Sequence, residues 1–209
     1  MTPASEQALA ILRRTDQFEW YVIPLLAFVV FAYVSQLQRK NWDAVLMGLI
    51  LSAAELSWEM ANALLLHFTG YAALWTTPGD TAYLILVGIN IEIFFMFAVA
   101  GLVLVMALPQ DRGQRILGIP NRLFVPTVFA LFCALVETLL NRVGALVWAY
   151  RYWSWPHVWT VFLGYALPML ATAWLYDRLS LRAKARVLLA CIAVDVVLWI
   201  VFVDVLGWI

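Results

Sequence analysis

Six long apolar stretches dominate the sequence and constrain its fold more than any other feature. They cover approximately residues 18–37, 43–66, 82–108, 122–148, 157–176 and 187–209. A helix needs about 20 mostly apolar residues to cross a bilayer core, and these stretches meet that requirement. Only 12% of the residues are charged and 65% are hydrophobic, whereas a soluble domain has roughly 25% charged residues. We therefore expect an all-α integral membrane protein, a bundle of about six transmembrane helices.

Short segments with turn-forming or charged residues separate the apolar stretches. They are Arg39-Lys40-Asn41, Thr77–Asp80, Pro109–Asn121, Arg151–Pro156 and Asp177–Arg186. Residues 1–17 mix charges with a short apolar run and lack the features of a signal peptide, so they predict an interfacial segment. Residues 18–209 are expected to form a single transmembrane domain.

The basic residues predict the orientation of the chain. Most of them lie in or beside the segments after the first, third and fifth stretches: Arg39, Lys40, Arg112, Arg115, Arg122, Arg178, Arg182, Lys184 and Arg186. The other side has Arg13, Arg14 and Arg151. Because cytoplasmic loops are enriched in Lys and Arg, this asymmetry predicts a multi-pass protein with both termini outside, in the cytoplasmic membrane if the source is bacterial.

Ionisable and amide side chains within the apolar stretches are the candidate functional residues, because a charge in the membrane is costly. They are Glu55, Glu59 and Asn62; Asn90 and Glu92; Glu137, Asn141 and Arg142; and Asp195. Spacings of four and three residues place the first three on one helical stripe. At 1.5 Å per residue, Glu55, Glu59, Glu92 and Glu137 are all expected in the outer half of the bilayer, with Asp195 nearer its middle.

Tryptophans accompany these acids. Trp58 and Trp199 lie beside buried acids, whereas most tryptophans of a membrane protein lie at the interface. Trp75 follows Glu59 by 16 residues, and Trp153 follows Glu137 by the same interval. This equal spacing is weak evidence and is compatible with either a repeated architecture or coincidence.

Two interpretations of the acids remain open. They can form a structural clamp between helices, with Arg142 as the counter-charge. One arginine cannot neutralise four carboxylates, however, so the remaining acids are expected to be neutral and able to donate protons. A proton donor within aromatic walls that exclude water suits carbocation chemistry on an alkene or epoxide.

The segment LSAAELSWEMAN from Leu51 to Asn62, preceded by Tyr33–Lys40 and followed by NIEIFFMFAVAG from Asn90, resembles the small transmembrane terpene cyclases of meroterpenoid biosynthesis. Those proteins carry a Trp-Glu pair late in the second span and an aspartate in the last span, which correspond here to Trp58-Glu59 and Asp195. Ile91–Phe95 is also similar to the acidic-aromatic motif of membrane lycopene cyclases, without that motif's proline and second acid. The terpene cyclases typically have seven spans, one more than expected here.

Together the residues and the resemblance predict a metal- and cofactor-independent isoprenoid cyclase or isomerase. Glu59 is expected to be the general acid, with Asp195 either assisting it or taking up the terminal proton. Glu55, Asn62, Glu92, Glu137, Asn141 and Arg142 are expected to support the proton network. Trp58, Trp75, Trp153 and Trp199 are expected to contact the substrate through their aromatic faces.

Two other functions use the same residues. A transport or solute-binding module would use the acids to hold a cation or relay protons. An accessory subunit would pair them with basic residues of a partner. The balanced charge favours no nucleic-acid partner, so the expected partners are the lipid bilayer and a lipophilic small molecule.

Overall fold

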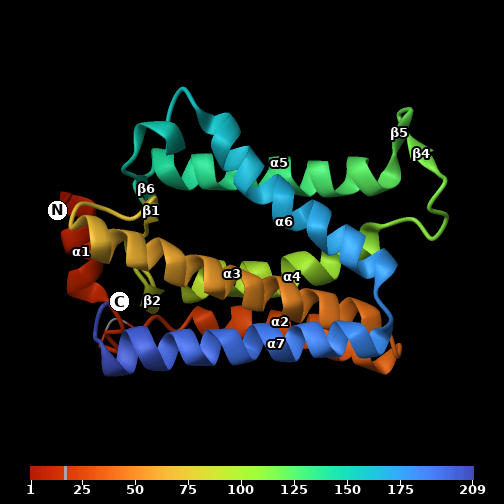
Figure 1. Ribbon diagram of the computed structural model, residues 1–209, viewed down its shortest axis with the longest axis horizontal. Helices are drawn as coiled ribbons and strands as arrows, with labels where there is room; N and C mark the ends of the chain where they lie inside the picture. The colour runs from red at the N-terminus through yellow and green to blue at the C-terminus, as the bar shows by residue number, and fades with distance from the viewer. Residues whose placement is uncertain (17) are drawn as a thin grey trace.

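The computed structural model describes residues 1–16 and 18–209 and is mostly helical. In the described part of the chain, six long helices run along the molecule (Figure 1). They are α2 (Val22–Gln38), α3 (Trp42–Thr69), α4 (Ile91–Ala107), α5 (Asn121–Arg142), α6 (Val158–Arg178) and α7 (Leu181–Trp199), the last continued by a π-helical segment, Ile200–Val205. A short helix, α1 (Pro3–Ile11), lies at the end of the bundle that carries both termini.

Four of these helices are long and apolar enough to cross a membrane: α3, α5, α6 and α7 with its π-helical segment. Helices α2 and α4 are also apolar, but each has 17 residues. At 1.5 Å per residue such a helix is about 26 Å long, slightly less than the roughly 30 Å of a hydrocarbon core. The prediction of a helical membrane protein is therefore confirmed, with four helices that qualify as candidate spans by length and composition.

Several predicted span boundaries were wrong because apolar composition does not distinguish a helix from a short hairpin. Residues 82–90 precede α4 and include the strands β2 (Leu84–Leu86) and β3 (Ile89–Asn90). Residues 143–148 follow α5 and end in β6 (Val147–Trp148). Conversely, most of the predicted loop 177–186 is helical, and α6 and α7 are separated only at Leu179 and Ser180.

Side-chain caps explain where three of the helices begin. Asn41 accepts a hydrogen bond from the Ala44 N–H at the start of α3, and Asn90 accepts one from Ile93 at the start of α4. Ser180 does the same for α7. Each cap satisfies a backbone donor that the first turn of a helix leaves unpaired.

Two more strand pairs lie in the connections. Strand β4 (Arg115–Ile116) pairs with β5 (Ile119–Pro120) between α4 and α5. Strand β1 (Trp75–Thr76), after α3, pairs antiparallel with β6, after α5. The β1–β6 pair therefore joins the α3–α4 half of the bundle to the α5–α6 half at the end that carries the termini (Figure 1).

The α3–α4 contact depends on two glycines that let the backbones approach closely. A Cβ atom on Gly101 of α4 would lie 3.1 Å from Cα of Gly48 and 2.9 Å from Cβ of Leu51, both in α3. Such small residues are characteristic of helix contacts within membranes. A larger side chain at Gly101 would force α3 and α4 apart.

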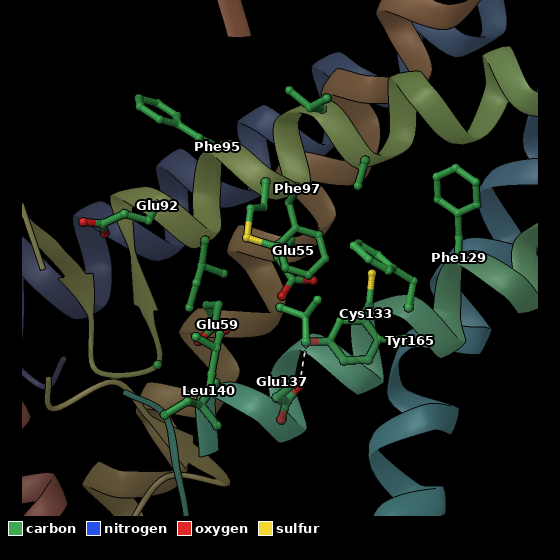
Figure 2. A pocket seen from close by; sticks show the side chains of 18 of the residues that line it. Glu55, Glu59, Glu92, Phe95, Phe97, Phe129, Cys133, Glu137, Leu140 and Tyr165 are labelled. Carbon is green, nitrogen blue, oxygen red and sulfur yellow. Dashed lines mark hydrogen bonds between the residues drawn. The ribbon is translucent and has the colours of Figure 1, made fainter. Parts of the chain in front are cut away.

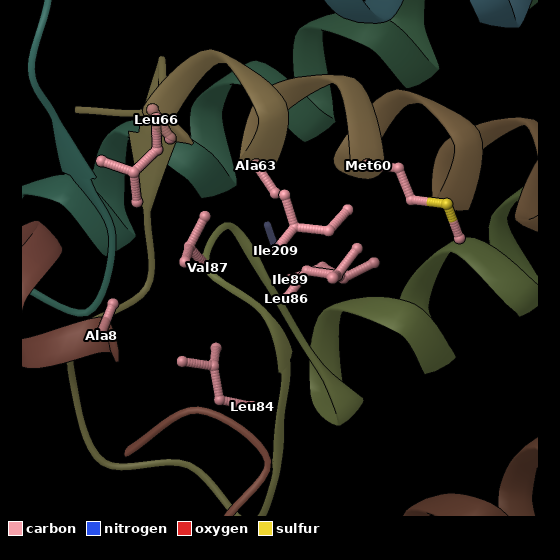
Figure 3. Packing of buried hydrophobic residues seen from close by; sticks show 10 residues of the cluster. Ala8, Met60, Ala63, Leu66, Leu84, Leu86, Val87, Ile89 and Ile209 are labelled. Carbon is pink, nitrogen blue, oxygen red and sulfur yellow. The ribbon is translucent and has the colours of Figure 1, made fainter. Parts of the chain in front are cut away.

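A second core region packs α1 against the end of the bundle. Ala8 of α1, Met60 of α3, Leu84 and Ile89 of the β2–β3 hairpin and the C-terminal Ile209 belong to one buried apolar cluster (Figure 3). The predicted N-terminal segment thus contains a packed helix. Its end at residue 17 lies outside the described residues.

Ion pairs lie at the opposite end of the bundle. Arg122 donates two hydrogen bonds to the Asp177 carboxylate, at 2.8 and 3.1 Å, and Arg112 approaches Asp177 at 3.2 Å. Lys184, with only 2% of its surface exposed, pairs with Asp43. The pairs connect α6 with α5 and with the segment before α5, and they connect α3 with α7.

Candidate functional site

A cavity of about 480 Å³ lies between α3 and α4 on one side and α5 and α6 on the other. Its walls are mostly apolar and aromatic, and α2 contributes to its rim. The carboxyl side chains in its lining are Glu55, Glu59, Glu92 and Glu137 (Figure 2). This is the size and composition expected of a small-molecule pocket, with a few polar groups in an apolar cavity.

Glu59 is buried and has hydrogen-bond donors on both carboxyl oxygens. The indole N–H of Trp75 donates to Oε1 at 2.8 Å, and the amide of Asn62 donates to Oε2 at 3.3 Å. Asn62 also donates to the Trp75 carbonyl and accepts from the Leu74 N–H. The helical stripe predicted from the sequence therefore anchors the loop after α3.

Glu137 occupies the corresponding place on α5 and accepts three hydrogen bonds. Trp148 and Trp153 donate their indole N–H groups to Oε1 at 2.7 and 3.3 Å. The Tyr165 hydroxyl, from α6, donates to Oε2 at 2.5 Å. The contributions of Trp148 and Tyr165 were missed by sequence reasoning. Tyr165 had no sequence signal, since it lies within an apolar run on another helix.

The equal spacing of the two Glu–Trp pairs has a structural counterpart. Trp75 and Trp153 stack on each other with ring centroids 5.3 Å apart. Each indole bonds to the glutamate 16 residues before it in the chain. The two halves of the pocket therefore meet at this aromatic pair, next to the β1–β6 strands.

Glu55 differs from the other two acids on α3 and α5. It lies one turn before Glu59, is partly buried, and lines the pocket. In residues 1–16 and 18–209 no side chain or backbone group forms a hydrogen bond or ion pair with its carboxyl group. Figure 2 shows this carboxyl group near Phe97, Cys133 and Tyr165 in the middle of the pocket.

Glu92 lies at the edge of the pocket and is not at the depth predicted for it. It is in the first turn of α4, where its carboxyl accepts from the Thr81 hydroxyl at 2.6 Å and the Ala82 N–H at 2.8 Å. The Tyr21 hydroxyl also donates to it. The predicted depth was wrong because the helix begins at Ile91 rather than near residue 82.

Arg142 is not the counter-charge of the acids. Its guanidinium lies 6.0 Å from the ring centroid of Trp155, on an exposed side chain at the end of α5. Among the described residues no Lys or Arg pairs with Glu55, Glu59 or Glu137. Asn141 bonds to the Leu146 carbonyl and closes the turn after α5. The ionic-clamp interpretation through Arg142 is therefore wrong.

Asp195 and Trp199 of α7 are not part of the pocket lining. Asp195 accepts a hydrogen bond from the Ser57 hydroxyl at 2.5 Å, which joins α7 to α3. Trp199 packs under Arg13, whose guanidinium lies 5.8 Å from its ring centroid. The structure thus separates both residues from Glu59, because depth along a helix does not specify the direction in which a side chain points.

The remaining predicted tryptophan, Trp58, lines the pocket and is exposed at the molecular surface. Other lining residues also reach the surface: Phe28 of α2 is 59% exposed, Met96 of α4 is 46% exposed and Phe132 of α5 is 61% exposed. Because these side chains are apolar and lie along the helices rather than at their ends, the pocket has an apolar side opening.

The comparisons agree with a membrane location. A family described as an uncharacterized membrane protein family matches residues 2–204. The chain belongs to this membrane protein family. A protein from Archaeoglobus fulgidus, described as uncharacterized, is 44% identical over 209 residues, covering 100% of this chain and 99% of the relative. No solved structure matches the chain. The family match includes all the acids described above.

No group of three or more His, Cys, Asp or Glu side chains is placed to hold a metal ion in residues 1–16 and 18–209. The carboxyl groups of the site can donate and accept protons. The site brings carboxyl groups and aromatic faces together in an apolar cavity.

Proposed function

We propose that the protein is a membrane-embedded cyclase or isomerase that acts on a lipid-soluble isoprenoid by proton-initiated carbocation chemistry. The observation that carries this proposal is the pocket itself, in which Glu55, Glu59 and Glu137 share an apolar aromatic cavity and pair with no Lys or Arg of the described part of the chain. An acid in such a cavity can protonate an alkene or an epoxide.

The aromatic lining supports the same chemistry. Trp58, Trp75 and Trp153 line the pocket, and indole rings attract a positive charge. The mostly apolar walls limit the water that would quench a carbocation. A volume of about 480 Å³ accommodates a terpenoid-sized hydrocarbon rather than a long polymer.

We also propose that all six helices α2–α7 cross the membrane and that both termini lie outside. The bundle end with β4 and β5 carries most of the loop arginines and lysines (Figure 1). Glu92, in the first turn of α4, and Glu137, near the end of α5, lie toward the other end, and Glu55 lies near the middle of α3. Slight thinning of the bilayer would accommodate the 17-residue helices. The ligand would then enter from the lipid through the apolar side opening.

The test is mass spectrometry of lipid extracts from cells that express the protein and are fed polyprenyl compounds and their epoxides. We expect a product with a changed ring count or double-bond position in wild-type cells. The triple variant Glu55→Gln/Glu59→Gln/Glu137→Gln should make none. Glu6→Gln, an exposed carboxyl on α1, is the matched control and should behave as wild type.

Two results would contradict the proposal: no product from the wild type, or equal product from the triple variant. Retention of an unaltered compound through purification would instead favour binding or transport. Transport further predicts substrate-dependent flux in proteoliposomes.

A further inference from the structure

The three acids on α3 and α5 differ in their hydrogen bonding, and the difference indicates separate roles. The oxygens of Glu59 and Glu137 accept from indole, amide and hydroxyl donors. A carboxyl group held in this way has a fixed orientation, and its oxygens are already occupied by hydrogen-bond donors. Among the described residues, the Glu55 carboxyl has no such donor.

The placement of Glu55 directs it toward a ligand. It lies one helical turn from Glu59, on the same stripe of α3, and lines the cavity. Glu55 is only partly buried, and among the described residues its carboxyl group has no partner, so within the apolar pocket it is available to contact a bound molecule. One turn before Glu137, the corresponding position on α5 is Cys133, which also lines the pocket. The two halves thus differ at this position.

We propose that Glu55 is the catalytic acid that contacts the substrate, and that Glu59 and Glu137 are positioning residues that hold Trp75 and Trp153. This inference rests on the proposed function and specifies the substrate class within it. The ligand is a branched polyene whose trisubstituted double bond lies against Glu55 while its chain extends along the aromatic wall toward the side opening.

The proposed proton transfer is balanced without a further reactant. The O–H bond of Glu55 breaks as a C–H bond forms at the less substituted alkene carbon, and the alkene π electrons make that bond. The resulting tertiary cation either loses a neighbouring proton or first accepts electrons from a second alkene, which closes a C–C bond. The Glu55 carboxylate then takes up the final proton, so the product is an isomer of the substrate.

Single variants test this assignment in the product assay. Glu55→Gln should reduce turnover by about 100-fold or more, since a general acid typically contributes 10²–10⁴-fold. Glu59→Gln and Glu137→Gln should retain turnover but change the product ratio, because the indoles that shape the cavity are less well held. A turnover loss confined to Glu59→Gln, with Glu55→Gln as active as wild type, would overturn the assignment and support Glu59 as the general acid.

A second experiment does not depend on turnover. Dicyclohexylcarbodiimide is a lipid-soluble reagent that modifies protonated carboxyl groups, and peptide mass spectrometry locates the adduct. In proteoliposomes we expect modification chiefly at Glu55, and geranylgeraniol added to the bilayer should reduce it. Adducts at Glu59 or Glu137 with Glu55 unmodified would overturn the inference. If the wild type makes no product but Glu55 is labelled and protected, the proposed reaction fails while Glu55 remains the ligand-facing acid.

Protein folding must be checked for each variant. Because the Glu55 carboxyl group forms no hydrogen bond or ion pair with a described residue, Glu55→Gln removes no such interaction. The variant should elute from size-exclusion chromatography in detergent at the same volume as the wild type. Glu6→Gln again serves as the matched control for carboxyl-to-amide exchange.

Discussion

Trp75 and Trp153 stack at an interplanar angle of 29°, and each donates its indole N–H to a different glutamate, Glu59 or Glu137. The two acids come from different helices, α3 and α5. The two indoles come from the segments that follow these helices, Trp75 from strand β1 and Trp153 from a short 3-10 helix, Arg151–Trp153. The stacked pair therefore connects the two halves of the pocket through side chains, in addition to the backbone pairing of β1 with β6.

Replacing Trp75 by Phe should destabilise the protein while leaving an aromatic ring in place. The change removes the indole N–H and leaves an oxygen of buried Glu59 without its donor. We expect a loss of about 1–3 kcal/mol, the usual cost of an unsatisfied buried polar group. Thermal unfolding in dodecyl maltoside, followed by circular dichroism, measures it. Trp20→Phe, at a 73% exposed position, is the control, and equal melting temperatures for the two variants would contradict the expectation.

Gly88→Ala should disturb the Glu59–Trp75 contact, because Gly88 lies in the β2–β3 hairpin next to both side chains. A Cβ atom there would lie 2.5 Å from Oε2 of Glu59 and 2.9 Å from Nε1 of Trp75, so these side chains would have to move. We expect a lower melting temperature and, in the product assay, a changed product ratio. Gly79→Ala is the matched control, since its nearest contact would be an ordinary 3.4 Å. Wild-type behaviour of Gly88→Ala would show that the Glu59–Trp75 contact is dispensable.

Asp43→Asn should weaken the contact between α3 and α7. Lys184 is almost fully buried beside the ring of Tyr176, and its ammonium pairs with Asp43, which is itself about half exposed. The expected loss lies between the ~1 kcal/mol of a surface pair and the ~3–5 kcal/mol of a buried one. Chemical denaturation in mixed micelles checks this value. Asp16→Asn, in an exposed pair with Arg14, should leave stability unchanged; an equal effect of both substitutions would argue against the burial of Lys184.

Asp195→Asn should leave product formation close to that of the wild type. Asp195 joins α7 to α3 through Ser57 and does not line the pocket, and an asparagine oxygen can still accept that hydrogen bond. The same lipid-extract assay provides the measurement. Abolished turnover with intact folding would instead restore the sequence-based prediction that Asp195 assists catalysis.

Cysteine accessibility should establish the orientation of the chain. In a variant without Cys133 and Cys191, a cysteine at Gln7 should react with a membrane-impermeant maleimide in intact cells. A cysteine at Gly113, between α4 and α5, should react only after permeabilisation. Both positions are exposed in the structure. The reverse pattern would invert the orientation that the loop charges predict.

The sequence predicted features that depend on local periodicity. The Glu55–Glu59–Asn62 stripe follows from helical spacing alone, and the caps at Asn41 and Ser180 lie at polar breaks that the pattern marked. The membrane setting followed from composition and is supported by the family match.

Features that depend on tertiary structure could not be predicted. Spacing gives the height of Asp195 along its helix but not its direction, so Asp195 was placed with Glu59 although it faces Ser57. Glu92 was assigned to the interior because an apolar hairpin has the same composition as a helix. Tyr165 reaches Glu137 only because α6 packs on α5, a relation that no local pattern encodes.

In the proposed function, the ligand passes the exposed apolar rim at Phe28, Met96 and Phe132, and its concentration in the lipid therefore governs binding. A ligand that enters the pocket from the bilayer is dissolved in the lipid, whose volume is a small fraction of the sample volume. Saturation then depends on the number of ligand molecules per lipid or detergent molecule, rather than on moles per litre of buffer. Diluting the ligand with extra lipid at constant bulk concentration would lower occupancy, and affinities for this pocket are comparable only when expressed as mole fractions.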